Sequence, residues 1–305
     1  MALVARTTAS TRPRSRAQRR ELLLLLAFAG PNFLFLAAFS YWPLIYNGYL
    51  SLVDWDMISP YKVFTGFSNY VELATDPDFG QIMLNTFVFS IGGVVATMTL
   101  GLLLAVLLNQ KLWGRDIART VLFAPNVVSG AAIAVVWAYI FDPNYGLLRF
   151  FLRAIGLPAP HWLTDSVWAL PAVIIVYAWK NLGYAMVVYL AGLQLIPKEL
   201  MESATIDGAG SGRRFFSVTL PLLSPTTFFL LVTSILGSLQ AFDIIKVLTG
   251  GGPVQSTTTL VYHMYQQGFV AFHAGRAAAT AILLFTLMLI ATLIQMRFVE
   301  RKVHY

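Results

Sequence analysis

A lysine interrupts a long apolar stretch, and its neighbours are polar enough to bind a solute. Lys180 lies near the middle of residues 167–193, beside Asn181 and one helical turn from Tyr184. An unpaired ammonium group costs at least about 3 kcal/mol at the centre of a bilayer, so such a lysine faces a bundle interior, finds a partner or contacts a ligand. We therefore expect Lys180, Asn181 and Tyr184 to line a path for an anionic or polyhydroxylated solute. The alternative is structural: the lysine pairs with a carboxylate such as Asp243, or extends to the membrane interface.

Other polar residues lie within or at the ends of apolar stretches and extend this candidate pathway. They are Asn85, Asn126, Ser129, Gln240 and Asp243. We assign Asn126, Gln240 and Asp243 to the pathway together with Lys180, Asn181 and Tyr184. Asp243 is expected at the end of a helix, where a carboxylate also has the simpler role of capping the helix or meeting water.

Several kinds of catalytic chemistry are excluded by what the sequence lacks. It has no cysteine, which excludes disulfides, thiolate catalysis and cysteine-ligated metals. Its histidines (His161, His263, His273 and His304) are scattered without the spacing of metal ligands. No Gly-x-x-x-x-Gly-Lys-Ser/Thr phosphate loop and no Gly-x-Ser-x-Gly elbow occurs. We expect no enzyme activity, no metal site and no cofactor in this chain.

The composition is that of a membrane protein. The chain has 305 residues, of which 57 % are hydrophobic and only 11 % charged, with a mean hydropathy of +0.69. A soluble domain of this length would be about one-quarter charged. The fold class we expect is therefore all-α with several membrane-spanning helices. In a membrane protein the positions of Lys and Arg indicate orientation, so we do not interpret the net charge of +7 as evidence of nucleic-acid binding.

Six stretches are long and apolar enough to span a bilayer, which requires about 20 residues each. They are residues 22–46, 82–108, 119–141, 167–193, 220–243 and 274–296. The first is too long for the apolar core of a cleaved signal peptide, so we expect a retained helix. Before it, residues 1–20 carry six arginines and no acid, which predicts a disordered cytoplasmic tail facing lipid headgroups. Residues 21–305 then form one six-helix transmembrane domain.

The distribution of positive charge predicts the orientation. With the N-terminus in the cytoplasm, fifteen Lys and Arg residues lie on the inner side and five on the outer side. This asymmetry places both termini in the cytoplasm. On the outer side, residues 142–166 include a short amphipathic helix with Leu147, Leu148, Phe151, Leu152 and Ile155, to which we assign no chemistry.

A polar, glycine-rich segment from Glu202 to Pro221 separates two of the apolar stretches. Pro197 suits the first position of a helix, and Asp207-Gly208 is a turn signal that ends it. Arg213 then opens a second helical run that closes at Leu220-Pro221. We expect a helix-turn-helix over about 197–221, outside the membrane.

The same segment resembles the cytoplasmic loop of ABC importer permeases, whose pattern is E-A-A, then D-G-A, then L-P. The matching residues are Glu202, Ala204, Asp207, Gly208, Ala209, Leu220 and Pro221. Ser203 stands where the E-A-A pattern has its first alanine. The resemblance implies that this helix docks into a partner ATPase, which binds ATP and Mg²⁺. It further implies the six-helix fold of type I importer permeases, a second permease subunit, two ATPase copies, an extracytoplasmic solute-binding protein and surrounding membrane lipid, with no nucleic-acid partner.

A second segment narrows the resemblance. Phe242-Asp243 followed by residues 247–253 (VLTGGGP) is similar to a segment of sugar-type permeases at the outer mouth of the pathway. Within the last third of the chain, Gly251–Gln255, Thr257–Leu260, Tyr265 and residues 297–303 are similar to the glycerol-3-phosphate (Ugp-type) branch, first membrane subunit. Independently of any family, the glycines and the proline of Gly250–Pro253 cannot continue a helix, so this loop must be buried in protein or line a wet cavity.

The function we expect is that of a permease subunit forming half of a pathway for glycerol-3-phosphate or a glycerophosphodiester in a bacterial cytoplasmic membrane. A sugar or oligosaccharide permease is the nearest alternative. A solitary ion-coupled transporter would more usually show several buried carboxylates. A membrane-embedded enzyme would need a catalytic cluster that the sequence does not contain.

Overall fold

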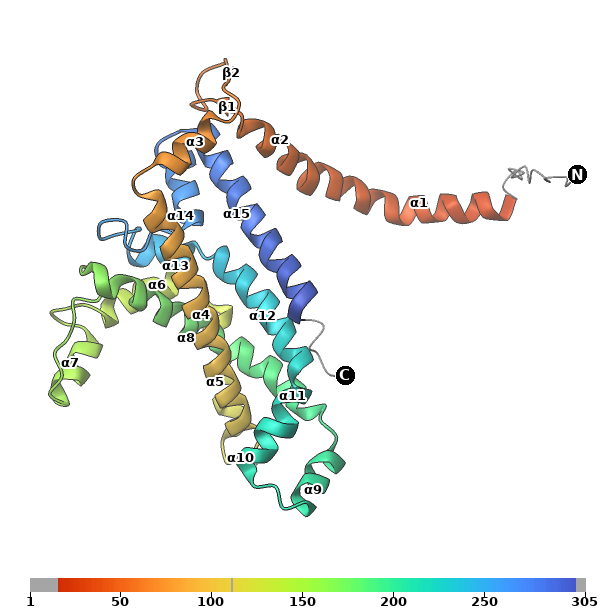
Figure 1. The fold of residues 1–305 in the computed structure, drawn as a ribbon, viewed down its shortest axis with the longest axis vertical. Helices are drawn as coiled ribbons and strands as arrows, with labels where there is room; N and C mark the ends of the chain where they lie inside the picture. Colours follow the sequence, from red (N-terminus) through yellow and green to blue (C-terminus); the bar gives the residue numbers. More distant parts are fainter. Residues whose placement is uncertain (1–15, 111, 300–305) are drawn as a thin grey trace, which may run out of the picture. The chain divides into compact units, whose positions relative to one another are not determined.

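The computed structural model describes residues 16–110 and 112–299, and within them the chain is almost entirely helical (Figure 1). Most of the predicted N-terminal tail lies outside the described residues. The α-helices are α1 (Arg16–Leu36), α2 (Trp42–Leu50), α3 (Ser68–Thr75), α4 (Phe79–Leu108), α5 (Arg115–Val127), α6 (Gly130–Ile140), α7 (Leu147–Ala154), α8 (Ser166–Gln194), α9 (Lys198–Ile206), α10 (Ser211–Arg214), α11 (Leu220–Leu222), α12 (Ser224–Leu239), α13 (Asp243–Leu248), α14 (Leu260–Tyr265) and α15 (Ala274–Ile294). Four π-helical segments, η1 (Ala37–Tyr41), η2 (Phe215–Thr219), η3 (Gln266–Val270) and η4 (Gln295–Val299), and two short strands, β1 (Val53–Asp54) and β2 (Val63–Phe64), complete the described elements.

The chain divides into two units, residues 1–49 and residues 50–305. In the first unit, α1, η1 and α2 follow one another without a break. The apolar stretch Leu23–Leu50 is 28 residues long, which is sufficient to cross a bilayer. Helix α1 already begins at Arg16, so the last five residues of the predicted disordered tail are helical. Ala, Gln and Arg are good helix formers and extend the apolar helix backwards.

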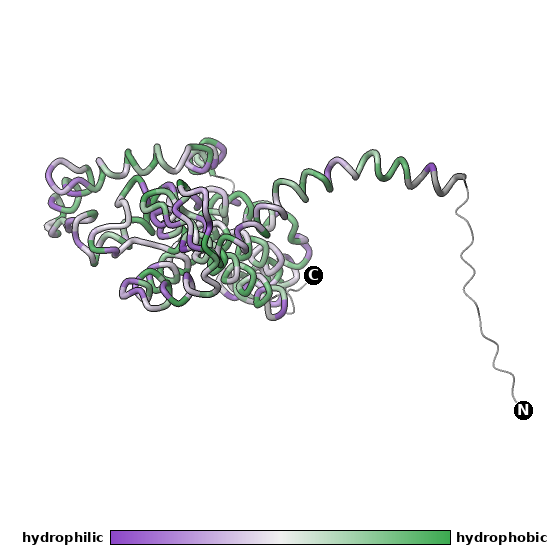
Figure 2. The backbone as a smooth tube through the Cα atoms, turned by 90° about the horizontal axis from the view of Figure 1, so that it is seen from above, coloured by the Kyte–Doolittle hydropathy of each residue, from purple (hydrophilic) through white to green (hydrophobic). Residues whose placement is uncertain are grey.

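The second unit contains three long, unbroken candidate spans, which are α4, α8 and the helix over Ala274–Arg297. Two further apolar segments are bent pairs: α5 and α6 meet at 106°, and the helix ending at Leu222 meets α12 at 64°. With Leu23–Leu50, the described residues therefore hold four candidate spans, or up to six if each bent pair is one span. In Figure 2 the helical run of the first unit is coloured largely as hydrophobic, as expected for the candidate span Leu23–Leu50.

The expected continuous helix over residues 119–141 is wrong, because the chain breaks between α5 and α6. Pro125 cannot donate a backbone hydrogen bond, and Val128 and Ser129 adopt extended conformations. The Ser129 side chain then accepts a hydrogen bond from the N–H of Ala132 at 3.3 Å and caps the new helix. The expected span over 220–243 is also different: its helix starts at Ser211 and bends at Leu223.

Two of the π-helical segments end two residues before a proline. Segment η1 precedes Pro43, and η2 precedes Pro221. Neither proline has an N–H to donate to the carbonyl four residues earlier, which lies inside the π segment in both cases. The wider turn accommodates this missing bond without ending the helix.

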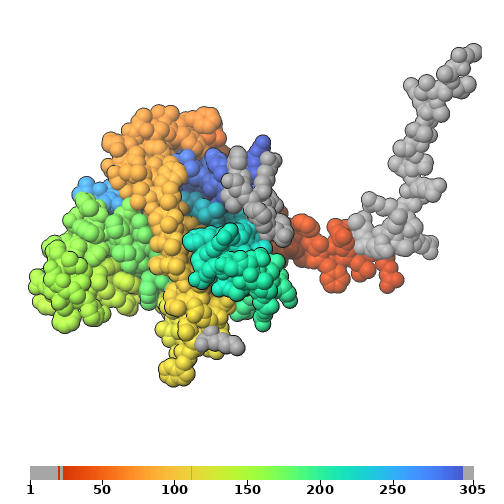
Figure 3. Space-filling model, turned by 60° about the horizontal axis from the view of Figure 1, so that its bottom comes forward, coloured from red at the N-terminus to blue at the C-terminus, as the bar shows by residue number. Residues whose placement is uncertain are grey.

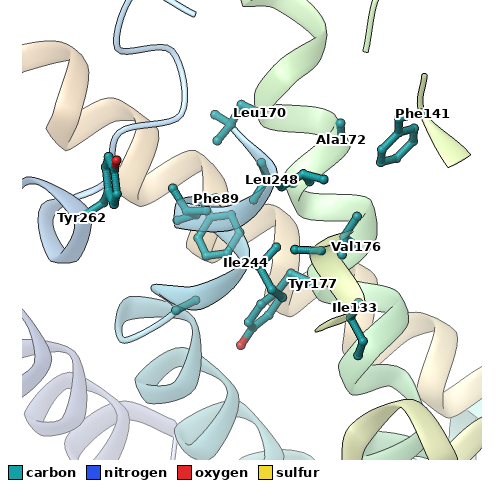
Figure 4. Packing of buried hydrophobic residues seen from close by; sticks show 14 residues of the cluster. Phe89, Ile133, Phe141, Leu170, Ala172, Val176, Tyr177, Ile244, Leu248 and Tyr262 are labelled. Atoms are coloured by element: carbon teal, nitrogen blue, oxygen red, sulfur yellow. The ribbon is translucent and has the colours of Figure 1, made fainter. Parts of the chain in front are cut away.

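Helices α4 and α8 form the centre of the second unit and pack closely along their length. Small residues allow this approach: a Cβ at Gly101 would lie 2.6 Å from the Cβ of Ala185, and one at Gly93 would lie 2.9 Å from the ring of Tyr177. Buried side chains of α4, α6, α8, α13 and α14 make one hydrophobic cluster around Phe89, Val176 and Ile244 (Figure 4). This cluster holds the broken span against α4 and α8.

The loop over 249–259 is partly buried in protein: residues 256–259 are buried, while Gly250 and Val254 are exposed. Thr257 and Thr258 are fully buried, and Gly250 and Gly251 adopt positive φ angles of 59° and 83°. Asn85 of α4 donates from Nδ2 to the carbonyl oxygens of Gln255 at 2.7 Å and Thr258 at 3.1 Å. Asn85, which the sequence suggested as a polar candidate, thus satisfies the backbone of a non-helical segment.

Candidate functional site

A polar cavity of about 240 Å³ lies among four helices of the second unit. The walls of this cavity are formed by α4, α5, α8 and α12, and each of these helices contributes at least one polar residue. The lining residues are Thr97, Asn126, Tyr177, Asn181, Tyr184, Thr233, Ser234 and Gly237. Hydroxyl and amide groups dominate this lining, and none of these residues carries a formal charge at neutral pH. Such a surface suits a polar solute that offers several hydroxyl groups.

Three of the residues predicted for the pathway meet in this cavity. Asn126 comes from the end of α5, and Asn181 and Tyr184 come from one side of α8. The Asn181 Nδ2 donates to the carbonyl of Tyr177 at 2.8 Å, which leaves its amide oxygen and its second N–H for a ligand. Tyr177 belongs to the same side of α8, at a spacing of four and seven residues from Asn181 and Tyr184.

Tyr177 connects the cavity to the hydrophobic cluster. Its ring packs edge-to-face on Phe89 with a centroid distance of 5.1 Å. In Figure 4 the Tyr177 hydroxyl points away from the clustered side chains. A Cβ built on Gly237 of α12 would lie 3.5 Å from that hydroxyl oxygen. The rigid ring therefore presents its polar end at the cavity wall.

Hydroxyl residues from α4 and α12 are the part of the site that the sequence reasoning missed. Thr97 is 3 % exposed, and its Oγ1 has no hydrogen-bond partner among the described residues. An unpaired buried hydroxyl costs about 1–3 kcal/mol, which a bound ligand would relieve. Thr233 and Ser234 stand on α12 opposite α8. Threonine and serine are common inside membrane helices, where they bond to their own backbone, so their pattern does not distinguish a site from a structural role.

Lys180 lies beside the cavity and does not line it. Its Nζ donates to the carbonyl oxygen of Asn126 at 3.2 Å, and the residue is partly buried. That carbonyl is in the last turn of α5, where the bend before α6 removes the normal backbone partner. A cation at this helix end also interacts favourably with the α5 dipole. The partner is thus a backbone carbonyl, and neither the Asp243 carboxylate nor the membrane interface.

Gln240 and Asp243 lie outside the cavity lining. Gln240 follows α12 and its Nε2 contacts the sulfur of Met288 on α15 at 3.5 Å. Asp243 begins α13, and its Oδ1 accepts from the N–H of Ile244 at 2.9 Å. A Cβ at Gly130, the first residue of α6, would lie 2.0 Å from Asp243 Oδ2. Asp243 therefore joins the first turns of α13 and α6, where its negative charge complements the α6 dipole.

The helix-turn-helix predicted over about 197–221 is present. Helix α9 spans Lys198–Ile206 and contains no buried residue. Its end is closed by backbone hydrogen bonds from Asp207 to the carbonyl of Ser203 at 2.9 Å and from Ala209 to that of Ala204 at 3.0 Å. Gly208 takes a φ of +78°, which reverses the chain.

Two side-chain contacts link α9 to the helical run that follows the turn. The Arg214 guanidinium donates to Thr205 Oγ1, and Thr219 Oγ1 lies 3.8 Å from the sulfur of Met201. Beside α9, a cavity of about 740 Å³ is lined by residues of α4, α8, α9, α10 and η2, including Glu202. Figure 3 shows residues 195–222 standing forward as an exposed mass next to the end of α4 and the start of α5. Leu220 and Pro221 belong to the membrane-side end of this segment.

These features define a class: a helical membrane protein with an exposed helix-turn-helix at one end of its bundle and a polar cavity within. A family model for the binding-protein-dependent transport system inner membrane component matches residues 97–305. The chain belongs to this family, which confirms the resemblance seen in the Glu202–Pro221 segment. It is accordingly a multi-pass protein of the cytoplasmic membrane.

Individual relatives agree with the family. The chain is 36 % identical over 286 residues to the sn-glycerol-3-phosphate transport system permease protein UgpA of Agrobacterium fabrum, covering 93 % of this chain and 97 % of that protein. It is 38 % identical over 276 residues to the UgpA of Yersinia pestis, covering 90 % and 93 %. A subunit in the crystal structure of a bacterial ABC transporter involved in the import of the acidic polysaccharide alginate has a TM-score of 0.78 at 26 % identity, covering 93 % of this chain and 96 % of that one.

Proposed function

We propose that this chain is one of two membrane-spanning subunits of an ATP-driven importer for glycerol-3-phosphate or a glycerophosphodiester. The observation that carries the solute is the similarity, over at least nine-tenths of each chain, to permeases named for glycerol-3-phosphate. The family match over residues 97–305 includes every residue that lines the polar cavity. The chain itself hydrolyses nothing in this proposal.

In this proposal the chain crosses the membrane six times, with both termini in the cytoplasm. The bent pairs α5–α6 and α10–α12 each count as one crossing, which brings the candidate spans to six. The excess of Lys and Arg on the side of α9 supports this orientation. Helix α9 then faces the cytoplasm, and α7, one crossing away along the chain, faces the outside.

The solute passes, in our proposal, through the polar cavity. Asn126, Asn181 and Tyr184 bond to the hydroxyl groups of the glycerol moiety, together with the hydroxyls of α4 and α12. Lys180 supplies positive charge next to Asn181 while holding the end of α5 through its bond to Asn126. Lys180 thereby offsets the negative charge of a phosphate that enters the cavity, although the residues that line the cavity are themselves uncharged.

Coupling to ATP hydrolysis occurs through α9. We propose that the exposed surface around Glu202, Ala204 and Asp207–Ala209 docks on a partner ATPase, which binds ATP and Mg²⁺. Motion of the ATPase reaches the cavity because the segment after Gly208 runs directly into α12. The full assembly would contain a second permease, two ATPase copies and an extracytoplasmic binding protein. In support, one related structure is an alginate transporter in complex with a pentasaccharide-bound periplasmic protein.

A sugar or oligosaccharide importer is the second candidate. Two observations favour it: the uncharged lining of the cavity, and the structural similarity to a polysaccharide importer. A solitary ion-coupled carrier fits less well, because the cavity lining contains no carboxylate.

The test is ATP hydrolysis by the chain reconstituted in liposomes with its second permease and ATPase. The binding protein is added empty, loaded with glycerol-3-phosphate, loaded with a glycerophosphodiester, or loaded with a maltose-type sugar. Stimulation by a glycerol-phosphate ligand alone supports the proposal. Stimulation by the sugar alone supports the sugar importer and contradicts the glycerol-phosphate solute. An intact complex whose ATP hydrolysis no ligand stimulates contradicts the importer role.

A further inference from the structure

The connection between α6 and α8 holds a short helix, α7, that combines apolar and basic residues. Helix α6 ends one apolar span at Ile140, and α8 begins the next at Ser166. The intervening 25 residues, which contain α7, are too polar and too short in helical stretches to cross, so they remain on one side. In the topology proposed above, α8 is one crossing, so these residues lie on the opposite face of the membrane from α9. In Figure 1, α7 stands at the margin of the second unit.

Helix α7 has three different sides. Leu148 packs against the main hydrophobic cluster, and Leu152, one turn later, is partly buried. A second side is apolar and exposed: Leu147 is 56 % exposed, Phe150 69 % and Phe151 56 %. On a helix with about 100° per residue, the mean direction of these three side chains is about a third of a turn from that of the two leucines. Helix α7 thus shows large apolar side chains that the rest of the second unit does not cover.

The third side is basic. Arg149 and Arg153 are four residues apart and so lie one above the other. Neither arginine takes part in an ion pair among the described residues, where the salt bridges involve Arg115, Arg119 and Arg276. The Arg149 guanidinium instead donates to the backbone carbonyl of Asn144.

The two acids of this connection are occupied by backbone groups. Asp142 accepts from the N–H groups of Asn144 at 2.7 Å and Tyr145 at 2.8 Å. These bonds from Tyr145 and Asn144, with a smaller attraction from Arg149, lower the pKa of Asp142. Asp165 accepts from the N–H of Val167 at 2.8 Å and caps α8. Both carboxylates serve local turns, and the basic side of α7 is left for an external anion.

Two tryptophans lie in and just after this connection. Trp162 stacks at a tilt on Phe141 with a centroid distance of 5.3 Å and edge-to-face on Trp168 at 5.1 Å. Trp168 lies in the first turn of α8, where the apolar span begins. Indole rings concentrate at the boundary between acyl chains and headgroups. Two indole rings therefore lie where this connection enters the α8 span.

We propose that α7 is an interfacial lipid anchor on the face opposite α9. Leu147, Phe150 and Phe151 enter the acyl boundary of that leaflet, and Arg149 and Arg153 bind the phosphates of anionic phospholipids. Charge complementarity selects this occupant: the exposed side of α7 combines large apolar groups with two unpaired cations, the composition of helices that lie in a membrane interface. Phospholipid phosphates near the surface each attract such a cation.

The absence of cysteine from the sequence makes a direct test possible. Phe150→Cys and Leu147→Cys variants carry a nitroxide label, with Val254→Cys, at a residue 91 % exposed in an outer loop, as the aqueous reference. The complex purified from the native host membrane is placed in nanodiscs containing phosphatidylglycerol or phosphatidylcholine, without binding protein. Collision of each label with oxygen, which partitions into lipid, is compared with collision with a water-soluble nickel chelate.

Labels at 147 and 150 are expected to favour oxygen, and the label at 254 to favour the nickel chelate. Adding Arg149→Gln and Arg153→Gln should shift the label at 150 toward water in phosphatidylglycerol and leave it unchanged in phosphatidylcholine. Labels at 147 and 150 that favour the nickel chelate overturn the proposal, and protection that appears only after adding the binding protein would assign α7 to protein docking. An equal response of the arginine variants in both lipids overturns the anionic-lipid part.

Discussion

The backbones of α5 and α8 touch at Gly183 and Leu122. A Cβ at residue 183 would lie 2.1 Å from the carbonyl oxygen of Leu122, which no side chain tolerates. One turn away on each helix, Lys180 bonds to Asn126 across the same pair of helices. The close approach therefore sets the geometry of two cavity walls and of the bent span.

Replacement of this glycine should abolish transport. Gly183→Ala forces α5 away from α8, which separates Asn126 from Asn181 and breaks the Lys180 bond. We expect a loss of solute-stimulated ATP hydrolysis and a lower melting temperature of the purified complex. Gly80→Ala is the matched control, since a Cβ there meets nothing within 4 Å. Equal activity of the two variants would contradict the assigned contact.

Removal of the buried Thr97 hydroxyl should impair the response to solute without lowering the stability of the protein. Thr97→Val keeps the shape of the side chain and deletes an Oγ1 that has no partner among the described residues. We expect the melting temperature to stay equal or rise, because the unpaired group costs about 1–3 kcal/mol, while solute-stimulated ATP hydrolysis falls. Thr286→Val, whose hydroxyl bonds to the Ile282 carbonyl at 2.8 Å on α15, is the control. A fall in stability without any change in solute response would assign Thr97 a structural role.

Lys180 should contribute through both its charge and its helix-capping bond. Lys180→Met removes the donor to the Asn126 carbonyl and leaves the end of α5 unsatisfied. We expect solute-stimulated ATP hydrolysis to fall strongly, with partial recovery in Lys180→Arg, which restores a cation. The dependence of the rate on solute concentration should also shift more for glycerol-3-phosphate than for a neutral solute. Unchanged transport with normal expression of Lys180→Met would rule out a part for this lysine in the pathway.

Gly208 should be required for coupling and not for folding of the spans. Its φ of +78° disfavours side chains by roughly 1 kcal/mol, yet the space around it is open. We expect Gly208→Asp to lower ATPase binding or to uncouple hydrolysis from solute, whereas the same change at Gly212, which is not in this conformation, should be milder. Co-purification of the ATPase with each variant measures this directly. A Gly208→Asp complex that couples like the parent would count against docking through this turn.

Much of the architecture can be predicted from the sequence. The length of each apolar stretch indicates a membrane span, and the positions of glycine and proline indicate turns. Helices α4 and α8 and the turn at Gly208 lie close to where the sequence predicts them. The break between α5 and α6 was not foreseen, since Pro125 within an apolar run is also compatible with a continuous helix.

The site was only partly predictable for a related reason. Asn126, Asn181 and Tyr184 stand out because they are polar in an apolar run, and they do meet in one cavity. The partner of Lys180 was missed because a free backbone carbonyl exists only where the helix bends. Residues at helix ends, such as Asp243, satisfy local geometry that a linear pattern does not reveal.

The central claim is that solute passes through the cavity bounded by α4, α5, α8 and α12. A single-cysteine variant, Ser234→Cys, places a small thiol in its wall. The rate of its reaction with a charged, membrane-impermeant thiol reagent is measured in the assembled complex, with Thr286→Cys on α15 as the control. We predict that the thiol at 234 reacts during ATP turnover and that glycerol-3-phosphate delivered by the binding protein slows this reaction, with no such effect at 286. A thiol at 234 that never reacts, or that reacts at the same rate with and without solute, would contradict the account.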